Sequence, residues 1–182
     1  MPYLKDFSGI FDEVMKQTKA DKLKKTPDNW SWAVCAATIV RYYNGGSVEA
    51  SAIANKALSI IQKEIKGRDI NTISIPEHPN LEQILKDYSI AAKVFPNIMN
   101  MPTGFPKIEE LKTQIDRNWP VIAWIKYEKE KYSDFIIIDS YDEKNLGIQD
   151  PLDPKAKKTS LDDLQKPEPG TWAARIHQYC GW

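Results

Sequence analysis

Apolar residues recur at intervals of three and four over residues 4–20, which predicts an amphipathic helix. Weaker patterns of the same period predict helices after Asn80 and over residues 107–118. Residues 29–43 differ, because the body of this segment is small and apolar on every side, so we expect a helix buried in the middle of the domain. The run Asn44-Gly45-Gly46 predicts its end, and Ser47 is expected to cap the next helix. Residues 22–27 are interpreted as a loop.

The pattern changes beyond residue 118. Short runs rich in branched and aromatic residues predict strands over residues 120–125, 135–138, 146–149 and 172–176, with a hairpin turn at 141–145. A further short strand is expected at 91–95, followed by a proline-rich loop at 96–106. Helices followed by an antiparallel sheet indicate the α+β class.

Composition narrows the function classes. The chain has 182 residues, 42% of them hydrophobic, and 25 basic residues balance 25 acidic ones, so neither nucleic acid nor a membrane is expected as a partner. With two cysteines and two histidines, no metal site and no cofactor are expected, although a single disulfide is left open. No apolar run reaches membrane-spanning length and no signal segment is visible, which favours the cytoplasm and leaves secretion after processing open.

Four motifs occur in an order that resembles a known family. Residues 29–36, Asn-Trp-Ser-Trp-Ala-Val-Cys-Ala, resemble the Asn-Trp-Cys-Trp-Ala-Ala-Cys-Ala stretch of bacterial papain-like cysteine peptidases, the branch with staphopain-like, effector and bacteriocin-leader-processing members. Residues 120–124 resemble that family's Pro-Val-Ile strand, and residues 133–142 its Gly-His-Phe-Val-Val-Ile-x-Gly-Tyr-Asp stretch. Residues 148–151 resemble its Asp-Pro motif. The similarity runs in register over about residues 25–175.

The resemblance implies a single papain-like domain over residues 1–182. A helical lobe over about residues 1–118 would contain the central buried helix, and this lobe would pack on an antiparallel sheet over about residues 119–182. Carried over position by position, the resemblance places Ser31 at the nucleophile, Asp134 at the general base, Asp150 at the orienting carboxylate and Lys25 at the oxyanion glutamine. Only Asp150 keeps the residue type of the family.

Ser31 is not expected to act as a nucleophile, because a serine hydroxyl needs a base to take its proton and an ordinary carboxylate titrates far below the operating pH. The simpler interpretation is a small polar residue bonded to a nearby backbone N–H. An engineered cysteine-to-serine change is a further alternative. Lys25 and Asp134 are hypothesised to form a salt bridge in place of the catalytic pair. Trp30 and Trp32 are expected to line the cleft, since aromatic walls bind peptides even without catalysis.

The sequence therefore predicts a catalytically degenerate papain-like protein that binds a peptide or protein partner or serves as an assembly module. One alternative is a hydrolase that uses Ser31. Another alternative is a structural protein that assembles with its own copies into a homo-oligomer. A net charge of zero removes repulsion between copies, and aromatic residues gather near the C-terminus. Cys35, inside the apolar helix, is expected to be buried and inert. The five aspartates between residues 134 and 153 lack EF-hand spacing and are interpreted as turn residues.

Overall fold

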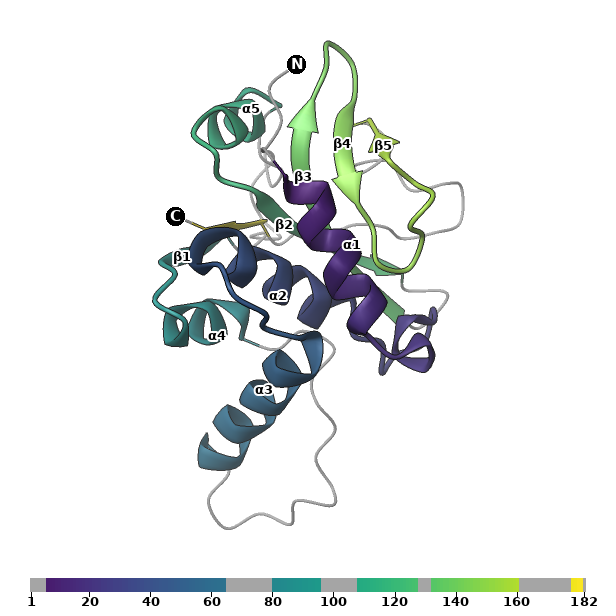
Figure 1. Cartoon of the computed structure of the whole chain (residues 1–182). Coiled ribbons are helices and arrows are strands. Elements are labelled where there is room, and N and C mark those ends of the chain that lie inside the picture. Colours follow the sequence, from purple (N-terminus) through teal and green to yellow (C-terminus); the bar gives the residue numbers. More distant parts are fainter. Residues whose placement is uncertain (1–5, 65–79, 96–107, 128–131, 161–177, 182) are drawn as a thin grey trace.

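The computed structural model describes residues 6–64, 80–95, 108–127, 132–160 and 178–181, and has an α+β fold, as predicted (Figure 1). The helices are α1 (Phe7–Gln17), the 3-10 helix η1 (Ala20–Leu23), α2 (Ser31–Asn44), α3 (Ala50–Glu64), α4 (Leu81–Asp87) and α5 (Ile108–Asp116). The strands are β1 (Ala92–Phe95), β2 (Val121–Tyr127), β3 (Tyr132–Tyr141), β4 (Leu146–Gln149), β5 (Lys158–Thr159) and β6 (Gln178–Gly181).

The described strands form one sheet in the order β1-β6-β2-β3-β4-β5, and each neighbouring pair is antiparallel. Strand β1 therefore joins the sheet from the part of the chain that precedes residue 118, at the edge next to β6. Helix α5 also comes from that part, and its apolar residues pack against β2 and β3.

Alternation along β2 and β3 gives the sheet two apolar faces. Ile122 and Trp124 of β2 pack with α1, α2, α3 and α4, together with Phe135 and Ile137 of β3. The intervening residues of both strands face α5, in a second core cluster made of Leu111, Ile115, Val121, Ala123, Ile125, Ile136, Ile138, Leu146 and Ile148. Because successive side chains of a strand point to opposite faces, a strand covered on both sides is a continuous apolar run.

Helix α2 is the centre of the larger cluster, with α1, α3 and α4 around it (Figure 1). Every residue from Ser31 to Arg41 is buried, as the small apolar sequence predicts. The buried Arg41 guanidinium donates from Nε to the carbonyl of Val48 at 2.6 Å and also contacts Gln17 and Glu13 of α1. Gly45 and Gly46 follow the helix with φ of 69° and 84°, which side chains with a Cβ rarely adopt.

Three sequence-based boundaries differ from the structure. The first helix ends at Gln17, and the Thr18 hydroxyl donates to the carbonyl of Val14 at 2.8 Å. The segment interpreted as a loop after it begins inside η1. Ser47 does not cap α3, because the helix begins at Ala50 and the carbonyl of Glu49 accepts its first N–H groups, from Ala52 and Ile53. The predicted loop at 96–106 and strand at 172–176 lie outside the described residues.

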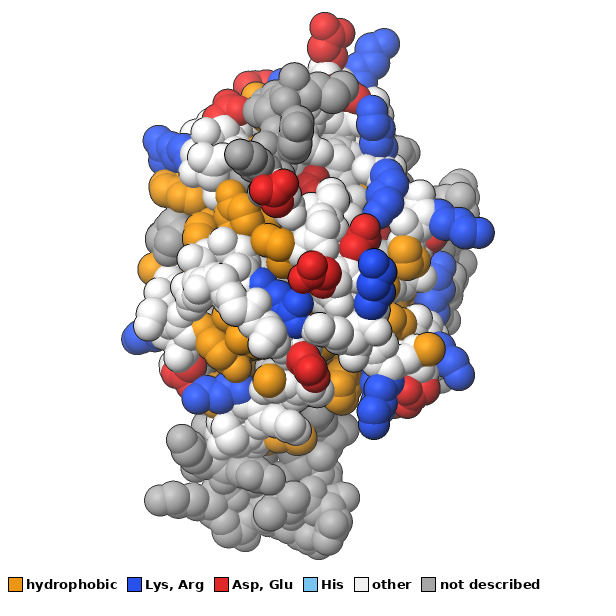
Figure 2. Space-filling view, viewed as in Figure 1, with side chains coloured by type: hydrophobic (Ala, Val, Ile, Leu, Met, Phe, Trp, Pro, Cys, Tyr) orange, Lys and Arg blue, Asp and Glu red, His pale blue; other side chains and the backbone are white. Residues whose placement is uncertain are grey.

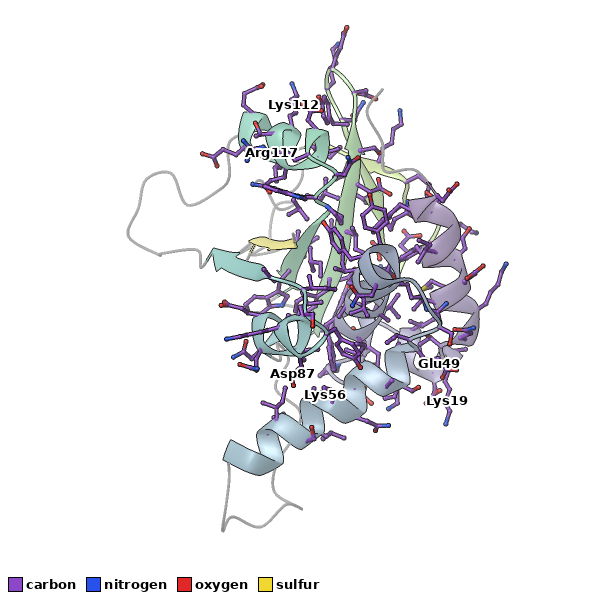
Figure 3. The ribbon with its side chains drawn as sticks, turned by 60° about the vertical axis from the view of Figure 1, so that its left-hand side comes forward. Lys19, Glu49, Lys56, Asp87, Lys112 and Arg117 are labelled. Atoms are coloured by element: carbon purple, nitrogen blue, oxygen red, sulfur yellow. The ribbon has the colours of Figure 1, made fainter. Side chains whose placement is uncertain are left out.

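Basic and acidic side chains are interspersed over the face seen in Figure 2, consistent with their equal numbers in the sequence. Lys56 of α3 and Asp87 of α4 meet at 2.9 Å and connect these two helices at the surface (Figure 3). Exposed pairs of this kind contribute little to stability, so the apolar clusters hold the fold. Among the helices that the structure describes, none is long and apolar enough to span a membrane.

Candidate functional site

The first turn of α2 meets the start of β3 through the backbone of Phe135. The backbone N–H of Phe135 donates to Ser31 Oγ at 3.0 Å, and its carbonyl accepts from Cys35 Sγ at 3.1 Å. Ladder pairing between β3 and β4 runs only as far as Ile137 opposite Gln149. The N–H and C=O of one residue in an antiparallel strand point to the same side of the strand. Both groups of Phe135 therefore point to α2, where Ser31 and Cys35, one helical turn apart, bind them as a neighbouring strand would.

Asn29 holds the Ser31 hydroxyl. Its Oδ1 accepts both the backbone N–H of Ser31 at 3.0 Å and the Ser31 hydroxyl at 2.8 Å, and its Nδ2 donates to the carbonyl of Thr26 at 2.7 Å. The residue preceding α2 is Trp30, and it makes no side-chain capping bond, so Asn29 supplies the acceptor from one position further back. The Ser31 hydroxyl has one proton, which is donated to Asn29, and its oxygen accepts from Phe135.

Two carboxyl groups lie near this hydroxyl. Asp134 is 3% exposed, and its carboxyl lies near Asp150 and Ser31, while its Oδ1 atom has no hydrogen-bond partner among the described residues. Burial, and secondarily the neighbouring charge of Asp150, raises the pKa of Asp134 well above its ordinary value. Burial and the same two carboxyl groups also raise the pKa of the Cys35 thiol. Ser31, Asp134 and Asp150, which are far apart in the sequence, are thus brought together by the fold, and Cys35 adjoins them.

The other predicted site residues lie differently. Lys25 is exposed, and none of the ion pairs of the described residues connects it to Asp134, so the hypothesised salt bridge is absent there. Trp32 is only 3% exposed and belongs to the core, so it does not line an open surface. Trp30 is half-buried, and the ammonium of Lys22 lies 5.5 Å from the centre of its ring.

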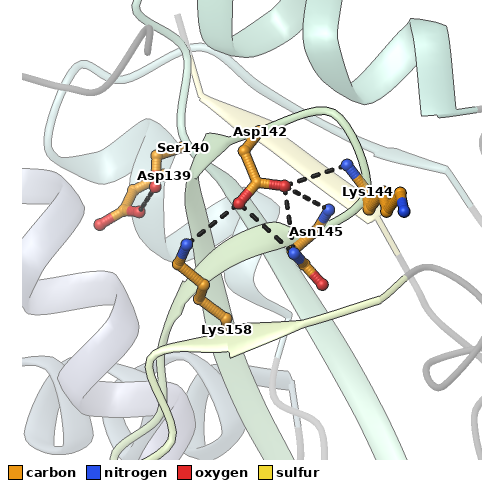
Figure 4. Close-up of polar contacts among 6 residues, drawn as sticks. All are labelled: Asp139, Ser140, Asp142, Lys144, Asn145 and Lys158. Carbon is orange, nitrogen blue, oxygen red and sulfur yellow. Dashed lines mark hydrogen bonds and ion pairs between the residues drawn. The ribbon is translucent and has the colours of Figure 1, made fainter.

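The aspartates interpreted as turn residues divide into two groups. Asp142 accepts from the backbone N–H groups of Lys144 and Asn145 at 3.0 and 2.8 Å, and from Lys158 Nζ at 3.0 Å (Figure 4). The hydrogen bond from the Lys144 N–H, and next the hydrogen bond from the Lys158 ammonium, hold the pKa of Asp142 far below its usual value. Asp150 and Asp153 also accept backbone N–H bonds in turns.

The remaining two aspartates are buried, contrary to a turn role. Asp139 is 5% exposed and accepts from the Ser140 hydroxyl at 2.9 Å and from Gln149 Nε2 at 2.7 Å, while Asp134 belongs to the cluster beside Ser31. Strand pairing shifts by one residue between Ile138 and Ser140, which places Asp139 in the irregularity. Within the described ranges, no group of three or more His, Cys, Asp or Glu side chains is arranged to hold a metal ion.

The sequence did not reveal the main partner of Ser31. That partner is the backbone of Phe135, and backbone groups have no signature in the residue pattern. Asn29 carried a weak signal, because an Asn two positions before a helix is a common acceptor for its first N–H groups. As a chemical unit, the cluster is a buried hydroxyl and a buried thiol that bond to Asn29 and to the backbone of Phe135, with two carboxyl groups nearby.

Comparison of the chain with known protein families, with curated proteins and with solved structures finds no match. The resemblance to papain-like cysteine peptidases therefore stays a prediction from the four motifs.

Proposed function

We propose that the chain is a catalytically inactive relative of papain-like cysteine peptidases that binds a peptide or a protein segment. The observation that carries this proposal is the state of Ser31 at the expected nucleophile position. Its side chain is 0% exposed, its proton is donated to Asn29, and its oxygen accepts the N–H of Phe135. A nucleophile needs access to substrate and a base that accepts its proton, and Ser31 has neither.

The neighbouring groups do not supply the missing chemistry. Asp134 occupies the expected base position, but the Ser31 hydroxyl donates its proton to Asn29, and no hydrogen bond of the described residues leads from Ser31 to Asp134. The Cys35 thiol is fully buried and its pKa is raised by burial, so the nucleophilic thiolate is disfavoured. Lys25, at the expected oxyanion position, is exposed. The proposed ancestral dyad is replaced by contacts that join a helix to a sheet.

Without catalysis, the remaining role of such a scaffold is to bind a peptide segment, and Trp30 is the proposed contact. Trp30 directly precedes Ser31 and is half-buried, so one part of its ring is available to a ligand beside the buried cluster. Lys22 lies over the same ring, and its ammonium is already paired with Asp28 at 3.5 Å, so the ring itself is the surface offered to a ligand. An aromatic ring with an adjacent cation is a common anchor for a peptide segment.

Catalysis is tested with a fluorophosphonate probe and a broad peptide library. The wild-type protein is expected to give neither labelling nor cleavage. Labelling or cleavage that disappears in Ser31→Ala would establish an active hydrolase and overturn the proposal. In the triple variant Ser31→Cys, Asp134→His, Lys25→Gln, cleavage is expected to appear if the scaffold is that of a peptidase.

Binding is tested by screening an immobilised peptide array and measuring the affinities of the hits in solution. Trp30→Ala is expected to weaken binding by about tenfold or more, since aromatic anchors dominate such contacts. Trp119→Ala is the matched control, because Trp119 is also half-buried, with the guanidinium of Arg117 5.1 Å from its ring. An array without hits, or equal losses in both variants, would contradict a binding role at Trp30. Light scattering on the same samples shows whether the chain binds its own copies instead.

A further inference from the structure

Asn44, the last residue of α2, is followed by Gly45, and this is the single Asn-Gly pair of the sequence. Both residues are exposed, and a Cβ added to Gly45 would meet no atom within 4 Å, so water reaches the pair. Asn-Gly pairs are the most reactive asparagine sites in proteins, because glycine has no side chain that would keep its nitrogen away from the preceding amide. The surroundings of Asn44 therefore decide how readily this pair reacts.

The side-chain amide of Asn44 holds the end of a neighbouring helix. Its Nδ2 donates to the carbonyl of Tyr88 at 2.7 Å, and Tyr88 is the residue at which α4 ends (Figure 1). The last carbonyl groups of a helix have no donor within the helix, so Asn44 supplies one of the missing partners. The two residues are 44 positions apart in the sequence, and their bond joins the ends of α2 and α4.

The backbone of the Asn-Gly pair is held as well. The N–H of Gly45 donates to the carbonyl of Arg41 at 2.9 Å and closes the last turn of α2. Deamidation requires the Gly45 nitrogen to attack Cγ of Asn44. For this attack Asn44 has to leave its helical backbone dihedrals and Gly45 has to give up its bond to Arg41. In the folded protein both reacting groups are thus bonded elsewhere, although both are open to water.

The reaction of this pair needs water alone. The Gly45 nitrogen bonds to Cγ of Asn44, the Cγ–Nδ2 bond breaks, and the proton of the Gly45 nitrogen leaves with Nδ2 as ammonia. Water then opens the cyclic imide. Opening at Cγ gives aspartate, and opening at the backbone carbonyl gives isoaspartate, in which the chain continues through Cβ and Cγ. In either product a neutral amide has become a carboxylate, and nothing is oxidised or reduced.

We propose that Asn44 is a deamidation site that its bond to the Tyr88 carbonyl protects, and that its conversion releases α4 from the end of α2. The product has no N–H to donate. Its negative charge faces the carbonyl of Tyr88 and lies at the C-terminal ends of two helices, where the helix dipole disfavours an anion. The contact that slows the reaction is therefore lost once the reaction has occurred. This inference is independent of the proposed function.

Peptide mass spectrometry of the full-length wild-type protein tests the site and its protection. Samples are incubated at neutral pH with and without urea, and the peptide that contains Asn44 is followed for conversion of amide to acid, with isoaspartyl methyltransferase as the probe for isoaspartate. Conversion is expected to be about tenfold or more faster in urea, where the bonds of Asn44 and Gly45 are open. Absence of conversion in urea would overturn the site, and equal rates in the two samples would overturn its protection.

Asn80→Ala tests whether α4 is the protecting element. Asn80 caps α4 by accepting the N–H of Gln83 at 3.0 Å, so its loss loosens α4 without changing the Asn-Gly pair. Deamidation of Asn44 in native buffer is expected to be about threefold or more faster than in the wild type. Thr18→Ala is the control, because it removes a hydroxyl bond at the end of α1 and none in α4. An unchanged rate in Asn80→Ala, or the same increase in both variants, would contradict the role of α4.

Asn44→Asp imitates one product and tests the release of α4. Its unfolding constant in urea is expected to be about fivefold or more above that of the wild type, because a hydrogen bond is lost and a charge is placed at two helix ends. Amide hydrogen exchange in α4 is expected to be faster as well. Asn55→Asp is the matched control, because Asn55 is also exposed but lies inside α3, and it is expected to stay within about twofold of the wild type. Equal effects of the two variants on unfolding and exchange would overturn the release of α4.

Discussion

Replacing Ser31 by alanine tests whether this residue connects helix to sheet. The change removes the acceptor of the Phe135 N–H, a 3.0 Å bond in a site where Ser31 is 0% exposed. Water does not replace the lost oxygen at such a site, so the N–H remains buried without a partner. Leaving a buried donor unsatisfied costs about 1–3 kcal/mol, which corresponds to an increase of roughly 5- to 150-fold in the unfolding constant. A cysteine at this position is expected to give an intermediate loss, because sulfur is a weak acceptor.

Urea unfolding followed by circular dichroism measures this effect as a shift of the midpoint at constant slope. Thr38→Val is the matched control, because Thr38 is a second hydroxyl residue of α2 that is 0% exposed. Its hydroxyl donates to the carbonyl of Val34 at 2.8 Å, and that carbonyl keeps its helical N–H partner when the hydroxyl is removed. The control is expected to change stability by less than about 1 kcal/mol. Equal changes in the two variants would refute the assignment of Ser31 as a connection between helix and sheet.

Three further predictions concern the framework of the site. In Gly147→Ala the new Cβ would lie 1.9 Å from Ser140 Oγ and would break the bond from Ser140 to Asp139, so the melting temperature is expected to fall well below that of the wild type. Gly9→Ala is the control, because its new Cβ has open space around it, and its melting temperature is expected to match or exceed that of the wild type. Removing the buried guanidinium in Arg41→Met leaves the carbonyl of Val48 without its donor, and a loss of about 2 kcal/mol or more is expected in urea unfolding. In Asp142→Asn the stability difference from wild type is expected to be full at neutral pH. It should shrink as the pH falls below the unfolded value of 3.8, because the pKa of Asp142 is lowered in the folded state; a difference that grows in acid would contradict this.

Much of the fold could be predicted because its signals are local. The buried character of α2 follows from a run of small apolar residues, its end from two glycines with positive φ, and the cap of α4 from Asn80, whose side chain accepts from the N–H of Gln83 at 3.0 Å. The doubly covered strands appear as apolar runs because both faces of the sheet are buried. Boundaries were less accurate where tertiary contacts decide them, as at Val48, whose carbonyl is held by Arg41.

The candidate site shows the same division. From the sequence alone, Ser31 is a small polar residue at the start of a buried helix, and the four motifs single out Asp134 and Asp150 as its expected companions. Only the tertiary structure shows that Ser31 has no exposed surface, that the Phe135 backbone bonds to the first turn of α2, and that Asp134 is buried beside it. These properties depend on burial and on contacts across about a hundred residues of sequence, which no local pattern specifies.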